Sequence, residues 1–114
     1  MIVLGEPASK ANQRRLVLKG GRPMFIKSAK ALAYAENFKS QAETQRPESL
    51  MEGDLSFIAR IYYASRRPDL DESLILDLLQ GIVYANDRQV KEKHVYWGLD
   101  KHNPRTELTI KQMP

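Results

Sequence analysis

Residues 55–63 of this 114-residue chain have the sequence LSFIARIYY. Successive side chains of a strand point to opposite faces of a sheet, so an alternating pattern indicates a strand with one buried face. One set of alternate positions is mostly apolar here: Phe57, Ala59, Ile61 and Tyr63. The polar segment Ser65-Arg66-Arg67-Pro68 follows directly and predicts a turn.

Acidic residues come immediately after this turn. The segment Asp69-Leu70-Asp71-Glu72-Ser73 precedes the apolar run 74–79, LILDLL. Negative charge is favourable at a helix N-terminus, so the run is expected to form a helix. Gly81 is a plausible stop for it. Further strands are expected over about 90–97 and 106–111.

The N-terminal part predicts strands and one long helix. Residues 2–4, IVL, suggest a short strand, and the apolar runs 15–18 and 24–26 flank Gly20-Gly21 as in a β-hairpin. Ser28 is expected to cap a helix over about 29–43. The spacing places four residues on one face of that helix: Leu32, Ala35, Phe38 and Ala42.

The expected order of elements is strand, hairpin, helix, strand, helix, strand, strand. A chain of this length fits one domain with a single core, here residues 1–114. We therefore predict an α/β or α+β domain with a mixed β-sheet and two main helices.

The composition excludes several classes of protein. Hydrophobic residues make up 42% and charged residues 28%, as in an ordinary globular domain. The absence of cysteine rules out disulfides, thiolate nucleophiles and cysteine-based zinc sites, and it fits a reducing cytoplasm. We find no signal peptide at the N-terminus and no apolar run near the roughly 20 residues of a membrane helix.

The net charge of +4 is concentrated in clusters. Basic clusters attract polyanions, which makes nucleic acid the first partner to consider. A solvated surface of ordinary lysine and arginine would explain the clusters equally well. The clustered residues are Lys10, Arg14, Arg15, Lys19, Arg22, Lys27, Lys30, Arg66, Arg67, Lys91 and Lys93.

Asp69 and Asp71 form the main candidate for chemistry. They flank one residue, so in an extended segment their side chains point to the same side. Asp87, in the polar turn before the 90–97 strand, is a plausible third carboxylate at the same edge of the sheet. Oxygen ligands of this kind suit Mg²⁺ or Mn²⁺, although helix caps and solvated charges are the more common roles. Asp77 is a weaker candidate, since pairing with a local arginine or backbone group would also explain it.

The segment from Arg66 to Val90 resembles the core of the RusA family. The resemblance lies in Pro68-Asp69-Leu70-Asp71, in residues 76–81, LDLLQG, and in residues 83–90, VYANDRQV. Residues 7–12 with Arg14-Arg15 are similar to the opening loop of that family, and residues 104–108 to its last strand. RusA proteins are small homodimeric endonucleases, often encoded by phages and prophages, that resolve Holliday junctions.

The resemblance implies a metal-dependent nuclease of branched DNA in the cytoplasm of a bacterial or phage-infected cell. Asp69, Asp71 and Asp87 would hold Mg²⁺ or Mn²⁺ as the catalytic residues. A homodimer would place two active sites on opposing strands of a four-way junction, so that paired nicks resolve it. The expected DNA contacts are Lys10, Asn12, Arg14, Arg15, Arg66 and Arg67.

The chain departs from the family pattern in three ways. Glu72 stands where the family usually has asparagine, the following helix is about two residues short, and Ile75 occupies the place of a lysine thought to assist catalysis. Either another cation takes over, such as Arg67, Lys91 or Lys93, or the protein binds branched DNA with weak or no cleavage. A metal nuclease that prefers flaps or forks is a further alternative.

Overall fold

The structure is a computed structural model that describes the backbone of residues 1–8 and 14–114 and the side chains of 1–8, 20–21 and 28–114. The order of elements is the predicted one, and the long helix begins and ends where the sequence places it. Within this described part, no helix is long and apolar enough to cross a membrane. The elements are β1 (Ile2–Leu4), β2 (Arg14–Lys19), β3 (Arg22–Lys27), α2 (Ala29–Glu43), β4 (Leu55–Tyr63), α3 (Ser73–Leu78), the 3₁₀ turn η1 (Asp87–Gln89), β5 (Val90–Leu99) and β6 (Arg105–Gln112).

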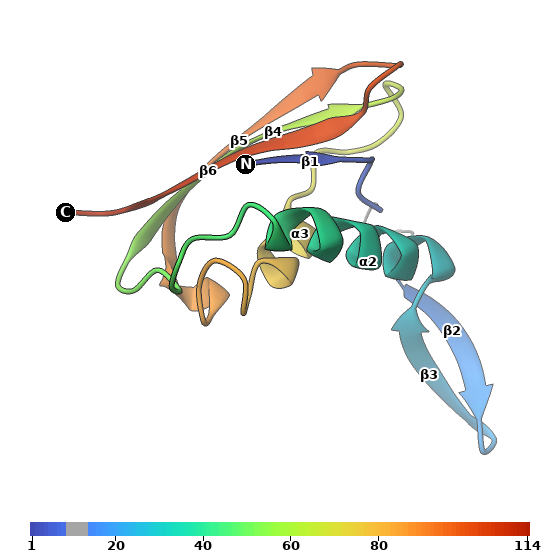
Figure 1. The fold of residues 1–114 in the computed structure, drawn as a ribbon. Coiled ribbons are helices and arrows are strands. Elements are labelled where there is room, and N and C mark those ends of the chain that lie inside the picture. Colours follow the sequence, from blue (N-terminus) through green and yellow to red (C-terminus); the bar gives the residue numbers. More distant parts are fainter. Residues whose placement is uncertain (9–13) are drawn as a thin grey trace.

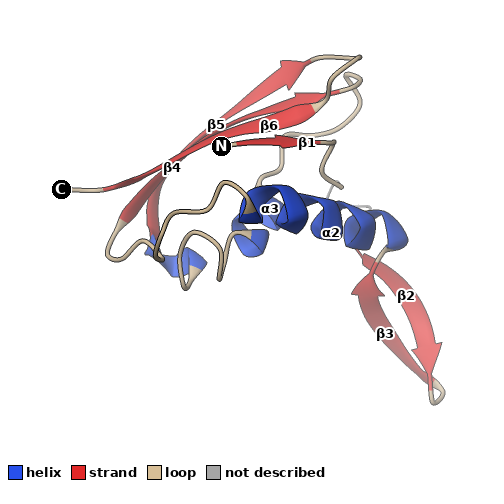
Figure 2. Ribbon diagram, in the orientation of Figure 1, coloured by secondary structure: helices blue, strands red, loops and turns tan. Residues whose placement is uncertain are grey.

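Four strands form a mixed sheet in the order β1-β6-β4-β5. β4 pairs antiparallel with β6 and parallel with β5, while β1 pairs antiparallel with β6 at the edge. Helices α2 and α3 lie on the same face of this sheet (Figure 1). The fold is therefore α+β, with the mixed sheet and two helices that the sequence predicts (Figure 2).

The core lies between the helices and β4. The alternation in residues 55–63 is confirmed, because Phe57, Ala59 and Ile61 are fully buried. The helix face is only partly as predicted: Leu32 is 50% exposed, and Ala31 and Tyr34 are buried instead. A helix turns about 100° per residue, so a face built on positions 31, 35, 38 and 42 leaves position 32 on its solvent side.

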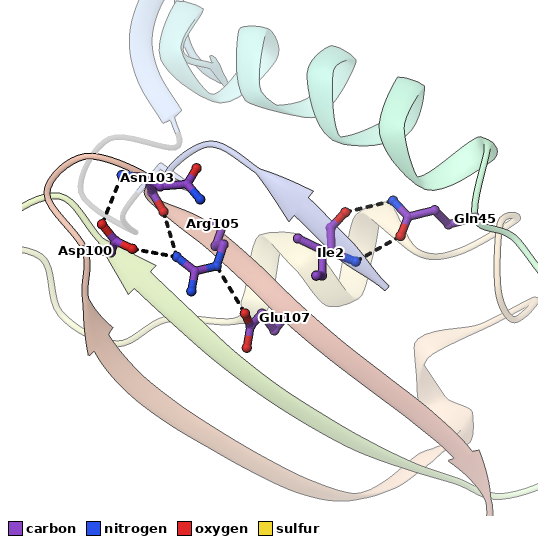
Figure 3. Close-up of polar contacts among 6 residues, drawn as sticks. All are labelled: Ile2, Gln45, Asp100, Asn103, Arg105 and Glu107. Carbon is purple, nitrogen blue, oxygen red and sulfur yellow. Dashed lines mark hydrogen bonds and ion pairs between the residues drawn. The ribbon is translucent and has the colours of Figure 1, made fainter.

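Two glutamine side chains, one in α2 and one just after its C-terminal end, hydrogen-bond to the edge of the sheet at β1. The Gln45 side chain accepts the Ile2 N–H at 2.9 Å and donates to the Ile2 carbonyl at 2.8 Å (Figure 3). Gln41 makes the same pair of bonds with Leu4, at 2.7 and 2.9 Å. These amides satisfy backbone groups that an edge strand would otherwise expose to another chain.

Arg105 holds the loop between β5 and β6. Its Nη1 donates to Asp100 Oδ2 at 2.8 Å and to the Asn103 carbonyl at 3.0 Å (Figure 3). Its guanidinium also lies 4.0 Å from the centre of the Tyr62 ring. The pKa of Asp100 is lowered, chiefly by this hydrogen bond. The Asp100 N–H in turn donates to the Tyr63 carbonyl at 2.9 Å, which ties the loop to the end of β4.

Strands β2 and β3 form a separate two-stranded hairpin that extends away from the sheet at the start of α2 (Figure 1). Gly20 and Gly21, at the turn, have φ angles of 59° and 77°. Positive φ at both positions is what a two-residue type I′ turn requires, so the Gly-Gly prediction of a hairpin is confirmed.

Candidate metal centre and nucleic-acid surface

Residues 68–72, here called the acidic loop, are anchored to two aromatic residues of the sheet. The Tyr63 hydroxyl donates to the Asp69 carbonyl at 3.1 Å and accepts the Asp71 N–H at 3.2 Å. The Trp97 indole N–H donates to the Pro68 carbonyl at 3.3 Å. Tyr63 and Trp97 lie on the paired strands β4 and β5. Their rings are stacked, with the ring centres 6.1 Å apart. The loop therefore has a defined backbone at the end of β4.

Asp71 is buried, with 8% exposure, while Asp69 is exposed. Asp71 Oδ1 accepts the Ser73 N–H at 3.0 Å and the Ser73 hydroxyl at 2.8 Å. Aspartate commonly forms such a turn with the backbone two residues further on. The formal N-cap residue, Glu72, makes no side-chain cap bond, so Asp71 shapes the start of α3.

A lysine reaches the acidic loop from β5. Lys93 Nζ lies 3.0 Å from Glu72 Oε1. Lys93 is opposite Phe57 in the parallel pair, which places it on the face of the sheet that carries α3. Ile75 is fully buried in the core, so a lysine at that position of α3 would have to be buried as well. Of the three cations considered as substitutes, Lys93 is the one with an ion pair to this loop.

Residues 85–89, here called the Asp87 turn, are organised by amide side chains. Asn86 Oδ1 accepts the Arg88 N–H at 2.9 Å, and Gln89 Oε1 accepts the Asn86 N–H at 3.1 Å, which forms a capping box. Gln80 Oε1 accepts the Asp87 N–H at 3.0 Å. These hydrogen bonds fix the backbone at Asp87, and Asp87 itself is exposed to solvent.

The structure places Asp69 and Asp71 on one loop and Asp87 on another. The acidic loop is bound to Tyr63, at the last pair of the parallel register, whereas the Asp87 turn leads into Val90, at the first pair. In the described residues, no three histidine, aspartate or glutamate side chains form a group that could hold a metal ion. The assignment of all three aspartates to a metal remains a prediction.

Asp77 lies near the Asp87 turn, to which it is linked through Gln80. It is exposed, and its Oδ1 accepts the Gln80 side-chain amide at 3.1 Å. The buried Tyr84 hydroxyl nearby donates to the Leu76 carbonyl at 2.6 Å. Burial raises the pKa of Tyr84, and the charges of Asp87 and Asp77 raise it further.

The sequence did not single out Tyr63, Trp97 or Glu6 for the site. Burial raises the pKa of Tyr63, and the charges of Asp71, Glu6 and Glu72 raise it further, against the lowering effect of the Asp71 N–H. Glu6 is thus within electrostatic range of the acidic loop. Alternation identifies Tyr63 as a core residue, but its hydrogen bonds are set by tertiary contacts that no local pattern encodes.

The predicted DNA contacts lie in three places. Arg66 and Arg67 are exposed, directly before the acidic loop. Arg14 and Arg15 are in β2, and Arg14 is paired with Lys27 at one end of the hairpin, while Lys19 is paired with Arg22 at the other. Lys10 and Asn12 lie outside the described residues.

Comparison with known proteins identifies the family. A comparison with curated proteins found no match. The model of the family described as endodeoxyribonuclease RusA matches residues 5–111, nearly the whole chain. The chain therefore belongs to the RusA family of endodeoxyribonucleases.

Proposed function

We propose that this protein resolves four-way DNA junctions with Mg²⁺ or Mn²⁺ as cofactor. The observation that carries the proposal is the anchored pair Asp69 and Asp71, on a loop held by Tyr63 and Trp97, in a chain of an endodeoxyribonuclease family. Asp87 is the third proposed ligand. All three supply carboxylate oxygens, which fit a hard divalent cation.

Each residue of the proposed site has a separate role in the reaction. A divalent cation bound here would activate water and stabilise negative charge on the phosphate. Asp71 presents a carboxylate whose orientation is fixed by Ser73, and Asp69 presents one on the exposed side of the same loop. Lys93, which is paired with Glu72, is the cation we assign to the phosphate in place of the lysine absent at Ile75.

The basic residues are proposed to hold the arms of the junction. Arg66 and Arg67 flank the acidic loop, and the hairpin carries Arg14 and Arg15. Contacts to phosphates position a substrate without reading its sequence, which suits recognition of a branched shape. Binding should weaken steeply with salt, and reversal of the charges at Arg14 and Arg15 should weaken it further. Junction binding as tight as that of the parent would remove the hairpin from the interface.

A homodimer is part of the proposal, because two symmetric nicks need two active sites. Sedimentation of the protein alone should give a species of twice the chain mass, and with a junction it should give a complex of two chains per junction. A monomer in both conditions would contradict paired cleavage.

One observation favours a second function, a module that binds branched DNA without cutting it. Ile75 is apolar and fully buried at the position where the family typically has a lysine. If no other cation replaces that lysine, junction binding remains and cleavage is lost.

The test is cleavage of a labelled synthetic four-way junction with Mg²⁺, Mn²⁺ or Ca²⁺. Asp71→Asn is the informative variant, since an amide oxygen can still accept the Ser73 hydrogen bonds while the negative charge is removed. Asp54→Asn, at an exposed aspartate just before β4, is the matched control. Flap and fork substrates are included in the same series.

Paired symmetric nicks by the parent and by Asp54→Asn, but not by Asp71→Asn, would support the proposal. Tight junction binding with no product under any metal would contradict it and favour the binding module. Equal or faster cleavage of flaps and forks would replace the resolvase with a nuclease of another specificity.

A further inference from the structure

Tyr63 is a buried residue that contacts the acidic loop. It is the last residue of β4 and is 1% exposed. Its backbone carbonyl accepts the Asp100 N–H at 2.9 Å, so its main chain is fixed by the β5–β6 loop. Its ring is fixed by the stacking with Trp97 at an interplanar angle of 26°. The position of the Tyr63 hydroxyl is therefore fixed by both the main chain and the ring of this residue.

That single hydroxyl bonds to both residues of the Asp-x-Asp pair. It donates to the carbonyl of Asp69 and accepts the N–H of Asp71, at 3.1 and 3.2 Å. The two bonds hold the backbone of both aspartates relative to each other and to the sheet. Trp97 adds a third bond one residue earlier, at Pro68. Both bonds are made to backbone atoms of the aspartates, so the effect is on backbone position.

We infer that Tyr63 is a positioning residue of the metal centre, which sets the separation of the Asp69 and Asp71 carboxylates through their backbones. This inference rests on the proposed function. Metal sites depend on groups outside the ligand shell that orient the ligands, and their loss typically weakens metal binding by about 10- to 100-fold. A displacement of about 1 Å is enough to loosen such a site.

A tyrosine hydroxyl can donate one hydrogen bond and accept another at once, as the two observed bonds to Asp69 and Asp71 require.

The neighbouring Tyr62 provides a matched control. It lies on the opposite face of the sheet, where its ring packs under Arg105. Among the described residues, its hydroxyl has none of the contacts that Tyr63 makes with the acidic loop. Tyr62→Phe and Tyr63→Phe thus remove the same atom from adjacent residues of one strand, and only the second change affects the proposed centre.

The experiment is calorimetric titration of the full-length protein with Mn²⁺ alone, accompanied by thermal unfolding of each variant. Tyr63→Phe keeps the stacked ring and is expected to weaken Mn²⁺ binding by about 10- to 100-fold. Tyr62→Phe should bind as the parent does. Trp97→Phe, which removes one bond at Pro68, should weaken binding in the same direction but less.

Two further variants keep the result interpretable. Phe38→Leu removes buried volume at a fully buried residue of α2 and measures what general destabilisation does to Mn²⁺ binding. Asp71→Asn tests the metal centre itself. If Asp71→Asn binds Mn²⁺ as the parent does, the proposed function has failed, and the role of Tyr63 fails with it.

If Asp71→Asn loses Mn²⁺ binding while Tyr63→Phe retains the affinity of the parent, the metal centre stands and Tyr63 does not position it. An equal loss in Phe38→Leu and Tyr63→Phe would also overturn the inference, since the loss would follow stability alone. A loss confined to Tyr63→Phe, Trp97→Phe and Asp71→Asn would establish it.

Discussion

The acidic loop and the Asp87 turn carry the same kind of side chain but are built in different ways. The acidic loop is held by Tyr63 and Trp97, and Asp71 is nearly buried within it. The Asp87 turn is held mainly by neighbouring amides, and Asp87 is exposed. The first region takes its geometry from aromatic residues of the sheet, and the second from amide side chains in and near the turn, one of which also binds Met51 and Gly53. A substitution should therefore change stability and activity differently in the two regions.

The largest loss of cleavage activity without a matching loss of stability is expected for Asp87→Asn. We expect cleavage of a four-way junction to fall by more than about 100-fold, because loss of a metal ligand should exceed the effect of an outer group. The free energy of unfolding should change by less than about 0.5 kcal/mol, since the residue is exposed and the turn uses its backbone N–H. Urea unfolding and the cleavage assay measure the two quantities. Cleavage at the parent rate would exclude Asp87 from the centre.

The Asp87 turn should depend most on Gln89. Its side chain accepts the N–H groups of Ala85 and Asn86 and donates to the carbonyls of Met51 and Gly53. Gln89→Ala is expected to lower the free energy of unfolding by about 2 kcal/mol, since each net hydrogen bond contributes about 1 kcal/mol and the site is partly exposed.

Gln80→Ala serves as the control for this change in urea unfolding, because Gln80 makes one bond to the backbone of the turn, at Asp87. An unchanged stability of Gln89→Ala would show that the turn does not depend on its amides.

Lys93 and Lys91 allow a comparison along β5. Lys93→Ala removes the cation paired with Glu72 beside the acidic loop. We expect cleavage to slow by roughly tenfold, less than the loss typical of a donor aimed directly at a developing charge. Lys91→Ala, on the same strand, should leave the rate unchanged. Equal rates for the two variants under single-turnover conditions would end the assignment of Lys93 as the substitute cation.

The smallest expected effect is a loss of stability at alkaline pH. Burial raises the pKa of Tyr63, beneath the acidic loop, and of Tyr84, beside the Asp87 turn. An unfolded tyrosine ionises near pH 10, so the stabilisation is fully present below that pH. It is lost as the pH rises from there towards the raised pKa of the folded state, because the unfolded state then binds fewer protons.

Urea unfolding at about pH 8 and about pH 11 measures this loss, with the difference expected to be smaller in Tyr63→Phe than in the parent. A stability that stays constant or increases over this interval would contradict the assigned direction.

Local patterns in the sequence predicted most of the fold. The alternation in residues 55–63, the Ser28 cap and the Gly-Gly turn each depend on neighbours in the chain, and all three are confirmed. The prediction that Leu32 lies on the buried face of α2 was wrong, because the spacing of apolar residues in α2 allows two overlapping faces. The packing of Ala31 and Tyr34 against the sheet decides between them, and this is a tertiary effect.

The sequence led us to propose ligands for the candidate site but not the residues that hold its backbone in place. Asp69, Asp71 and Asp87 were identified from their spacing and from the resemblance, and their roles are still predictions. Tyr63 and Trp97 gave no local signal, because they reach the acidic loop through the parallel pairing of β4 and β5. That pairing also places the Asp87 turn, which leads into Val90, at the other end of the strand pair from Tyr63.

The most direct test of the central claim is whether the two regions serve one metal ion. Mn²⁺ affinity would be measured by calorimetry for the parent, Asp71→Asn, Asp87→Asn and the double variant. If both aspartates hold the same ion, each single change weakens binding strongly, and the double variant loses much less than the sum of the two losses. Mn²⁺ binding that is lost in Asp71→Asn but unchanged in Asp87→Asn would contradict a shared centre.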